Sequence, residues 1–144
     1  MKIITENRKA LHNYEILEKY EAGLVLIGPE IKSIRQGQVS INEAFGRLIG
    51  GELFLINAYI APYKQARIED YDPRRSRKLL LHKGEIKKLI GKLQQKGLVL
   101  VPLKLYLKTG RAKLELGLGK GRKLFDKREK IKKREIERRL KRLV

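Results

Sequence analysis

The clearest pattern of apolar and polar positions lies between residues 98 and 118. Residues 98–108 begin as an apolar run and then alternate, and alternation resumes after Thr109-Gly110. A period of two is typical of strands with one buried face, so the pattern predicts a β-hairpin. The side chains predicted to face inward are Leu103, Leu105, Leu107, Ala112, Leu114, Leu116 and Leu118.

Two short helices are predicted elsewhere. Residues 84–96 place apolar side chains at i, i+3, i+4 and i+7, and Gly97 follows as a terminating residue. Residues 28–37 predict a helix of about two turns, because Pro29 suits the first helical position and Gly37 the C-terminal stop.

Short strands are expected in the first half of the chain. Gly50-Gly51 is a two-residue hairpin signal, since glycine reaches the positive φ that such turns require. A bend or bulge is expected at residues 21–23, and the polar residues 1–12 are expected to be mobile. The ranges predicted as strands are 14–17, 24–27, 44–49, 52–57 and 59–63.

Many short strands with small helices indicate a mainly β protein with small α-helices. We expect an OB-like closed antiparallel β-barrel over residues 1–123, followed by a flexible basic C-terminal tail over residues 124–144.

Positive charge is concentrated in the second half of the chain. Residues 1–70 hold 9 Lys/Arg and 9 Asp/Glu, whereas residues 71–144 hold 26 and 7 and so carry the whole formal charge of +19. From residue 119 onward there are 13 Lys/Arg against 4 Asp/Glu. Such a segment buries too little apolar surface to fold alone, so it is either an arm that folds on a polyanion or a solvated terminal helix.

Several functional classes fit the sequence poorly. No apolar run approaches the ~20 residues of a membrane span, and the N-terminus lacks the apolar core of a signal peptide. The absence of cysteine is compatible with a cytoplasmic protein. His12 and His82 lie 70 positions apart without a nucleophile or metal-ligand spacing. We therefore expect no enzyme and no metal.

Two groups of cations are candidates for nucleic-acid binding. Arg74, Arg75, Arg77 and Lys78 place four cations in five residues, and their mutual repulsion favours a bound anion. The outward face of the predicted hairpin would offer phosphate contacts and an aromatic stacking surface, or it is an ordinary solvated sheet face. Its members are Lys104, Tyr106, Lys108, Arg111 and Lys113.

The alternating glycines before the basic tail allow two interpretations. Gly117 and Gly119 let a final strand bend out of the barrel, or their backbone N–H groups approach phosphates. The segment does not match the phosphate-loop pattern G-x-x-x-x-G-K-[ST].

Long segments of the chain carry a family resemblance. They include EAGLVLIGPEIKSIRQG at 21–37, RKLLLHKGEI at 77–86 and VPLKLY at 101–106. With these, the chain resembles the SsrA-binding protein (SmpB) family over nearly its whole length. The resemblance implies an OB-like barrel without enzymatic activity or cofactor. It also implies binding to the transfer-RNA-like domain of transfer-messenger RNA and its delivery to ribosomes stalled on messages without a stop codon.

The resemblance also implies which residues contact the RNA. These are Asn7, Glu21 and Leu80, with Arg77 and Lys78 beside them. A carboxylate such as Glu21 can accept hydrogen bonds from base amino groups or 2′-hydroxyls. Without the resemblance, Glu21 would be read as a residue that caps the bend at 21–23.

The same resemblance implies that the tail enters the decoding centre and becomes helical in the message channel of the stalled 70S ribosome. Phe125 stands where many relatives carry histidine, which keeps base stacking but removes a charged role. The residues expected to contact the ribosome are Lys120, Gly121, Arg122, Lys123, Phe125, Asp126, Lys127, Arg128, Lys130, Lys132, Lys133 and Arg134.

The alternatives are a basic structural protein built permanently into the ribosome and a binder of anionic membranes. The thin apolar stripe of the tail makes the membrane reading weaker. We expect a monomer with RNA partners and no membrane.

Overall fold

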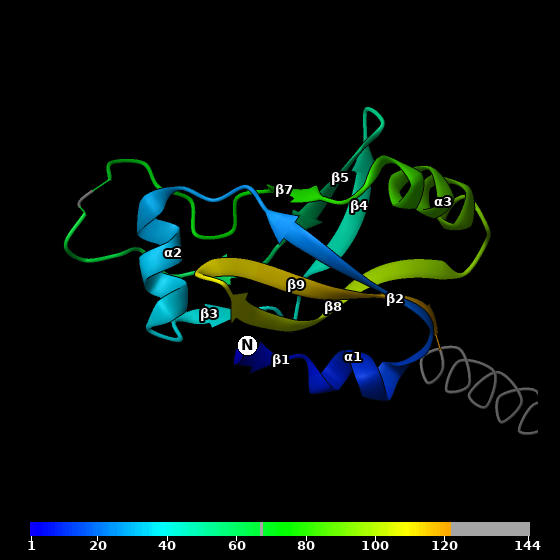
Figure 1. Ribbon diagram of the computed structural model, residues 1–144, viewed down its shortest axis with the longest axis horizontal. Helices are drawn as coiled ribbons and strands as arrows, with labels where there is room; N and C mark the ends of the chain where they lie inside the picture. The colour runs from blue at the N-terminus through cyan, green and yellow to red at the C-terminus, as the bar shows by residue number, and fades with distance from the viewer. Residues whose placement is uncertain (67, 122–144) are drawn as a thin grey trace, which may run out of the picture.

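The structure is a computed structural model that describes residues 1–66 and 68–121 (Figure 1). Over these residues the chain is mainly β with small helices, as the sequence predicts, and it has three helices where two were predicted. The elements in chain order are β1 (Lys2–Glu6), α1 (Arg8–Asn13), β2 (Tyr14–Leu24), α2 (Gly28–Arg35), β3 (Val39–Ser40), β4 (Phe45–Ile49), β5 (Glu52–Ile56), β6 (Tyr59–Ile60), β7 (Arg77–Leu80), α3 (Lys83–Leu93), β8 (Leu98–Lys108) and β9 (Arg111–Gly121).

One large antiparallel sheet organises the molecule. Its strand order is β1-β8-β4-β5-β7-β2-β9, and β9 also pairs with β8. The pairings therefore run from β8 through five other strands and return to β8, with β1 attached at the side. Helices α2 and α3 lie at opposite ends of the sheet, and α1 lies along its flank (Figure 1). Strands β3 and β6 form a separate two-stranded sheet.

The β8–β9 hairpin is confirmed. Lys108 pairs with Arg111 across the turn, and the four predicted inward residues of β9 are all buried in the main core. The alternation on β8 is interrupted by a register shift between Pro102 and Lys104. Leu103 accordingly packs in a second cluster with Ala10 and Val101 instead of in the core that holds Leu105. The prediction that these two leucines share one face is wrong for this reason.

The β4–β5 hairpin and both predicted helices are also confirmed. Gly50 and Gly51 have φ of 57° and 79°, which is the left-handed geometry of a two-residue hairpin turn. Gly46 lies where β4 approaches β8, and a Cβ there would be 2.6 Å from Leu100 Cδ2. In α3, Leu89 is fully buried in the main core.

The N-terminal prediction is wrong, because residues 2–13 form a strand and a helix. β1 pairs with β8, about a hundred positions away along the chain. Asn7 begins α1: its Oδ1 accepts from the Ala10 N–H at 3.0 Å, and its Nδ2 donates to the carbonyls of Ile41 and Pro102 at 3.2 and 2.9 Å. The polar composition of residues 1–12 was therefore not a valid sign of mobility.

β2 differs from the predicted pair of strands. It runs unbroken from Tyr14 to Leu24, and residues 21–23 pair with β9 in continuous register, without the predicted bend or bulge. The irregularity lies earlier, as a register shift between Ile16 and Glu18. Residues 25–27 lie outside any strand, and the strand predicted at 59–63 is only the two-residue β6.

A second, smaller core forms where α1 packs against β8 and the first residues of β2. A Cβ on Gly117 would lie 2.9 Å from Leu103 Cδ1, and one on Gly119 would lie 3.0 Å from Tyr14 Cβ. Because these glycines have no side chains, residues of β8 and β2 can pack directly against the backbone of β9. β9 continues through both glycines to Gly121, so the predicted bend out of the sheet is wrong. The predicted tail, residues 124–144, lies outside the described residues. Among the described helices, none has the length and apolar character to cross a membrane.

Candidate RNA-binding site

Glu21, Leu80 and the turn of the β8–β9 hairpin meet on one side of the sheet. Gly23 on β2 pairs with Leu80 on β7 and also with Lys113 on β9, so the three strands bring these positions together. Three adjoining hollows share Lys113 as a lining residue. We call their lining the Glu21–Leu80 surface; its residues include Glu21, Gly23, Leu80, His82, Glu85, Lys108, Arg111 and Lys113.

The carboxylate of Glu21 is the acidic group of this surface. Its side chain is 43% exposed, and its Oε2 lies 3.6 Å from Lys108 Nζ. The Tyr106 hydroxyl donates a hydrogen bond to the same Oε2. That hydrogen bond, with the nearby charges of Lys108 and Lys113, holds the pKa of Glu21 below its usual range. The residue is therefore a carboxylate, and an acceptor of hydrogen bonds, at neutral pH.

Leu80 supplies the apolar part of the Glu21–Leu80 surface. Its side chain is 49% exposed. Three cations, Lys108, Arg111 and Lys113, lie along the neighbouring hairpin. A carboxylate acceptor, an apolar contact and cations for phosphates form a combination suited to the base edges, 2′-hydroxyls and backbone of folded RNA.

The predicted aromatic stacking face is wrong. Tyr106 is only 5% exposed, and in register it stands beside Ile3 of β1. Its ring cannot stack on a base from this position. Lys104, two residues earlier, is half-buried and pairs in register with Glu6 and Glu115.

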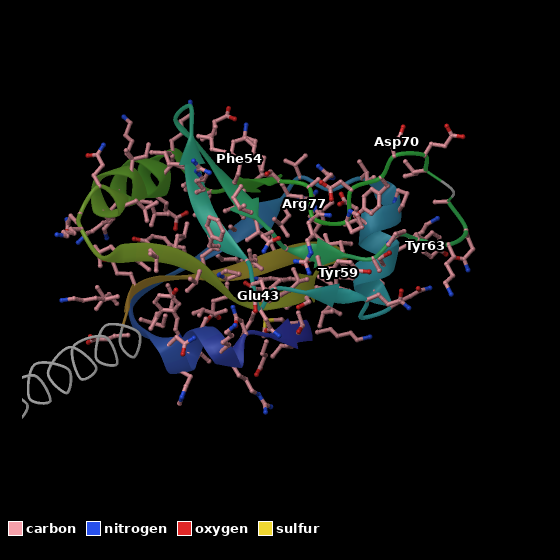
Figure 2. All side chains as sticks on the ribbon, turned by 180° about the vertical axis from the view of Figure 1, so that it is seen from behind. Glu43, Phe54, Tyr59, Tyr63, Asp70 and Arg77 are labelled. Carbon is pink, nitrogen blue, oxygen red and sulfur yellow. The ribbon has the colours of Figure 1, made fainter. Side chains whose placement is uncertain are left out.

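In the predicted basic loop, Arg75 and Arg77 bind a carboxylate of the protein itself, that of Glu30. Arg77 is fully buried, and its guanidinium donates to Glu30 Oε2 from Nε at 2.9 Å and from Nη2 at 2.6 Å. Arg75 donates to the same carboxylate, as does the Tyr71 hydroxyl at 3.0 Å. Figure 2 shows Arg77 inside the fold, whereas Asp70 lies on the outer loop. Arg77 is therefore a structural residue, and the inference that this cluster needs an external anion is wrong for it and for Arg75.

Burial opposes the charge of Glu30 and by itself would raise its pKa. The hydrogen bonds from Arg75, the Ile27 backbone N–H and Arg77 outweigh burial, so the pKa of Glu30 lies below its usual value. The remaining cations of the cluster are at the surface. Arg74 donates to the Asn57 carbonyl at 3.1 Å and lies over the Tyr59 ring, and Lys78 pairs with Glu52 at 3.1 Å.

Asn7 is a buried residue. Its side chain is 1% exposed, and it joins α1 to the chain near Ile41 and Pro102 through the three hydrogen bonds given above. Direct contact of this side chain with RNA is not compatible with that burial. A helix-capping asparagine at the start of residues 8–13 was the sequence signal for its structural role.

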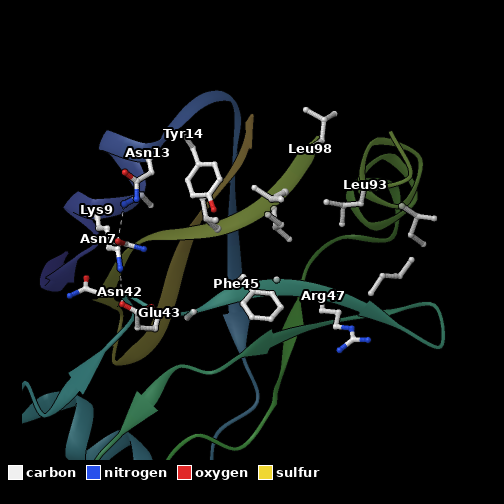
Figure 3. A pocket seen from close by; sticks show the side chains of 18 of the residues that line it. Asn7, Lys9, Asn13, Tyr14, Asn42, Glu43, Phe45, Arg47, Leu93 and Leu98 are labelled. Carbon is white, nitrogen blue, oxygen red and sulfur yellow. Dashed lines mark hydrogen bonds and ion pairs between the residues drawn. The ribbon is translucent and has the colours of Figure 1, made fainter. Parts of the chain in front are cut away.

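A cavity of about 570 Å³ lies between α1, β4, α3 and β8 (Figure 3). Tyr14 and the 41% exposed Phe45 line it, together with the amides Asn13, Asn42 and Gln94. Sequence reasoning missed it, because its walls come from several elements that are distant in the sequence and contain no motif. The exposed aromatic residue in β4 was the one available signal.

The predicted ribosome contacts are only partly described. Lys120 and Gly121 form the exposed end of β9 beside Glu15 and Tyr14 of β2. The others lie outside the described residues: Arg122, Lys123, Phe125, Asp126, Lys127, Arg128, Lys130, Lys132, Lys133 and Arg134. Over residues 1–66 and 68–121, no three His, Asp or Glu side chains gather as a metal site would.

Comparison with known proteins gives a consistent result. The SmpB protein family matches residues 4–144. An SsrA-binding protein of Carboxydothermus hydrogenoformans is 57% identical over 95% of this chain and 92% of its own length, and one of Thermosynechococcus vestitus is 54% identical over 100% and 95%. A solved structure described as "tmRNA-SmpB: a journey to the center of the bacterial ribosome" is 56% identical, with a TM-score of 0.69 over 83% of this chain and 84% of that chain. The chain belongs to the SmpB family of SsrA-binding proteins.

Proposed function

We propose that this protein binds the transfer-RNA-like domain of transfer-messenger RNA and delivers it to stalled 70S ribosomes for trans-translation. Its relatives are named SsrA-binding proteins, and the description of the similar solved structure names transfer-messenger RNA, SmpB and the bacterial ribosome. The observation that carries the proposal is the Glu21–Leu80 surface, where an ionised carboxylate, an exposed leucine and cations lie together. The protein acts by binding in the cytoplasm, as a monomer, without cofactor or membrane.

The fold proposed for this role is an OB-like closed barrel over residues 1–123. The return of the strand pairings from β9 to β8 supports it. Residues 124–144 act as a basic tail that becomes helical in the message channel. Their charge supports this role, because cations release counterions from an RNA backbone.

Within the barrel, Glu21 and Leu80 read the RNA, and Lys108, Arg111 and Lys113 hold its phosphates. Arg74, Lys78 and Lys104 supply further phosphate contacts from the neighbouring strands and loop. Asn7, Arg75 and Arg77 act indirectly, because their side chains hold α1 and the 71–77 loop in place.

The test is a gel-shift series with the transfer-RNA-like domain of transfer-messenger RNA and a structured control RNA of equal length, at matched salt. Glu21→Gln should weaken specific binding by about tenfold to a hundredfold, as expected for loss of a hydrogen bond to a charged group. Glu18→Gln is the matched control, since Glu18 lies on the same strand and also accepts from a tyrosine. Equal affinity of the wild type for both RNAs would reject the proposal.

A second experiment separates the barrel from the tail. Truncation before Asp126 should leave binding to free transfer-messenger RNA within about threefold, which is roughly 0.7 kcal/mol. It should also abolish peptide tagging on stalled ribosomes in a reconstituted translation system. Loss of RNA binding on truncation would show that the tail, and not the Glu21–Leu80 surface, provides the affinity.

A further inference from the structure

Two buried tyrosines donate hydrogen bonds to glutamates of β2. Tyr20 donates to Glu18 on its own strand, and Tyr106 donates to Glu21 from β8. Because β9 pairs with both β8 and β2, the Tyr106 side chain reaches across β9 to its acceptor. The pair is separated by 85 positions, so this contact is a product of the tertiary fold.

Without Tyr106, the surroundings of Glu21 would leave its carboxylate poorly placed. Glu115 stands directly opposite in the β2–β9 register, and like charges in opposite positions repel. Lys108 and Lys113 attract the carboxylate from two sides. The other titratable side chains of the Glu21–Leu80 surface are Arg111, His82 and Glu85. Long lysine side chains are mobile, so they do not by themselves fix one orientation.

The hydroxyl of Tyr106 is a hydrogen-bond donor whose position is fixed by the buried side chain that carries it. Tyr106 as a residue is 5% exposed, so its ring is held by packing. The contacts recorded among the described residues, from the hydroxyl and from Lys108 Nζ, both go to Oε2 of Glu21. Oε1 thus remains able to accept from a donor outside the protein.

We infer that Tyr106 is a positioning residue for RNA recognition, whose hydroxyl orients the Glu21 carboxylate so that Oε1 accepts from a base amino group or a 2′-hydroxyl. The inference rests on the proposed function. It adds that a buried side chain, which never touches the RNA, sets the affinity of the Glu21–Leu80 surface. A carboxylate already held in place loses less conformational freedom when the RNA binds.

The experiment combines Tyr106→Phe with Glu21→Gln, using the transfer-RNA-like domain of transfer-messenger RNA as probe. Tyr106→Phe should weaken binding by about tenfold, the size of one hydrogen bond. The same change in the Glu21→Gln background should have less than a twofold effect, because the residue that it positions is already altered. Tyr20→Phe is the matched control and should leave the affinity unchanged, since it frees Glu18 instead.

A pH series adds a readout that a merely structural role would not move. RNA affinity of the wild type should fall only on acidification below the ordinary carboxyl range, because the Tyr106 hydrogen bond lowers the pKa of Glu21. In Tyr106→Phe this loss should move to higher pH. Carbon NMR of the Glu21 carboxyl in the wild-type chain measures the same pKa without any variant.

Three results overturn the inference while leaving the proposed function standing. One is that Tyr106→Phe binds as well as the wild type although Glu21→Gln does not. Another is an equal loss from Tyr106→Phe in both backgrounds, which would show that Tyr106 acts independently of Glu21. The third is a Glu21 carboxyl that titrates at its ordinary value in the wild type. A wild type without preference for the probe over a control RNA would reject the proposed function itself.

Discussion

Replacing Glu30 by glutamine should destabilise the fold more than any exposed charge change. The side chain of Glu30 is 1% exposed and receives hydrogen bonds from Arg75, Arg77, Tyr71 and the Ile27 N–H. Glutamine preserves the volume and one acceptor oxygen. It removes the negative charge that balances two guanidinium groups, one of them fully buried.

The magnitude follows from that burial. Breaking a buried ion pair by altering one partner costs about 3–5 kcal/mol, because the remaining charge is left uncompensated. Arg77 keeps its hydrogen bonds to the carbonyls of Ala58 and Pro73 at 2.6 and 3.0 Å, so we expect the lower end, about 3 kcal/mol. That is a large part of the 5–15 kcal/mol by which domains of this kind are typically stable.

The assay is urea unfolding at neutral pH followed by circular dichroism, with the free energy extrapolated to water. The matched control is Glu43→Gln, since Glu43 forms an exposed pair with Lys9 at 2.8 Å. Such pairs contribute about 0–1 kcal/mol. A Glu30→Gln protein within 1 kcal/mol of the wild type, roughly the value of a surface pair, would refute the reasoning.

The pKa of Glu30 also predicts how the stability of the fold decreases in acid. The pKa of Glu30 is lower in the folded protein than its ordinary value of 4.5. Its contribution is therefore fully present above pH 4.5 and is lost as the pH falls from there through the folded pKa. Stability of Glu30→Gln should fall less steeply over this interval, as unfolding curves at successive pH values would show. Parallel curves for the two proteins would contradict the assignment.

The remaining predictions concern packing, capping and the proposed RNA surface. Gly46→Ala should cost about 1–3 kcal/mol, because its Cβ would overlap Leu100, whereas Gly91→Ala in α3 has open space and should gain about 0.5–1 kcal/mol; urea midpoints distinguish these signs. Asn7→Ala should cost about 2 kcal/mol through the lost helix cap and two buried carbonyl partners, and no shift in its melting temperature would contradict this. Leu80→Ala should change stability by less than about 0.5 kcal/mol, since the site is half exposed, while weakening the gel shift with transfer-messenger RNA; unchanged binding would remove Leu80 from the site.

Local patterns predicted the elements that depend on local physics. Strict alternation around Thr109-Gly110 gave the β8–β9 hairpin, and apolar spacing gave α3, because one buried face is enough to create each pattern. Gly50-Gly51 likewise identified its turn. The basic, carboxylate and leucine positions that meet on the Glu21–Leu80 surface were identified by family resemblance and residue type.

Long-range pairing explains the errors. Arg77 was read as an exposed cation because its partner Glu30 lies 47 positions earlier, and no local pattern reports an ion pair at that distance. Tyr106 was read as outward-facing because alternation cannot show that its ring is buried and its hydroxyl bound to Glu21. β1 was missed because its partner strand, β8, begins at residue 98. In each case the deciding partner lies far away in the sequence, so the local pattern could not show it.

The pairing of β9 with both β2 and β8 has a consequence for biosynthesis. Tyr14 at the start of β2 pairs with Gly121 at the end of β9. β2 is therefore fully paired only after the last described residue has been synthesised. Contacts this distant in sequence form slowly, and a chain made from its N-terminus cannot complete its sheet until β9 has emerged. A copy cut short before residue 111 would leave β2 and β8 with open edges that invite aggregation. Folding is thus a late event, and an unfinished copy of this protein is itself a poorly folded product.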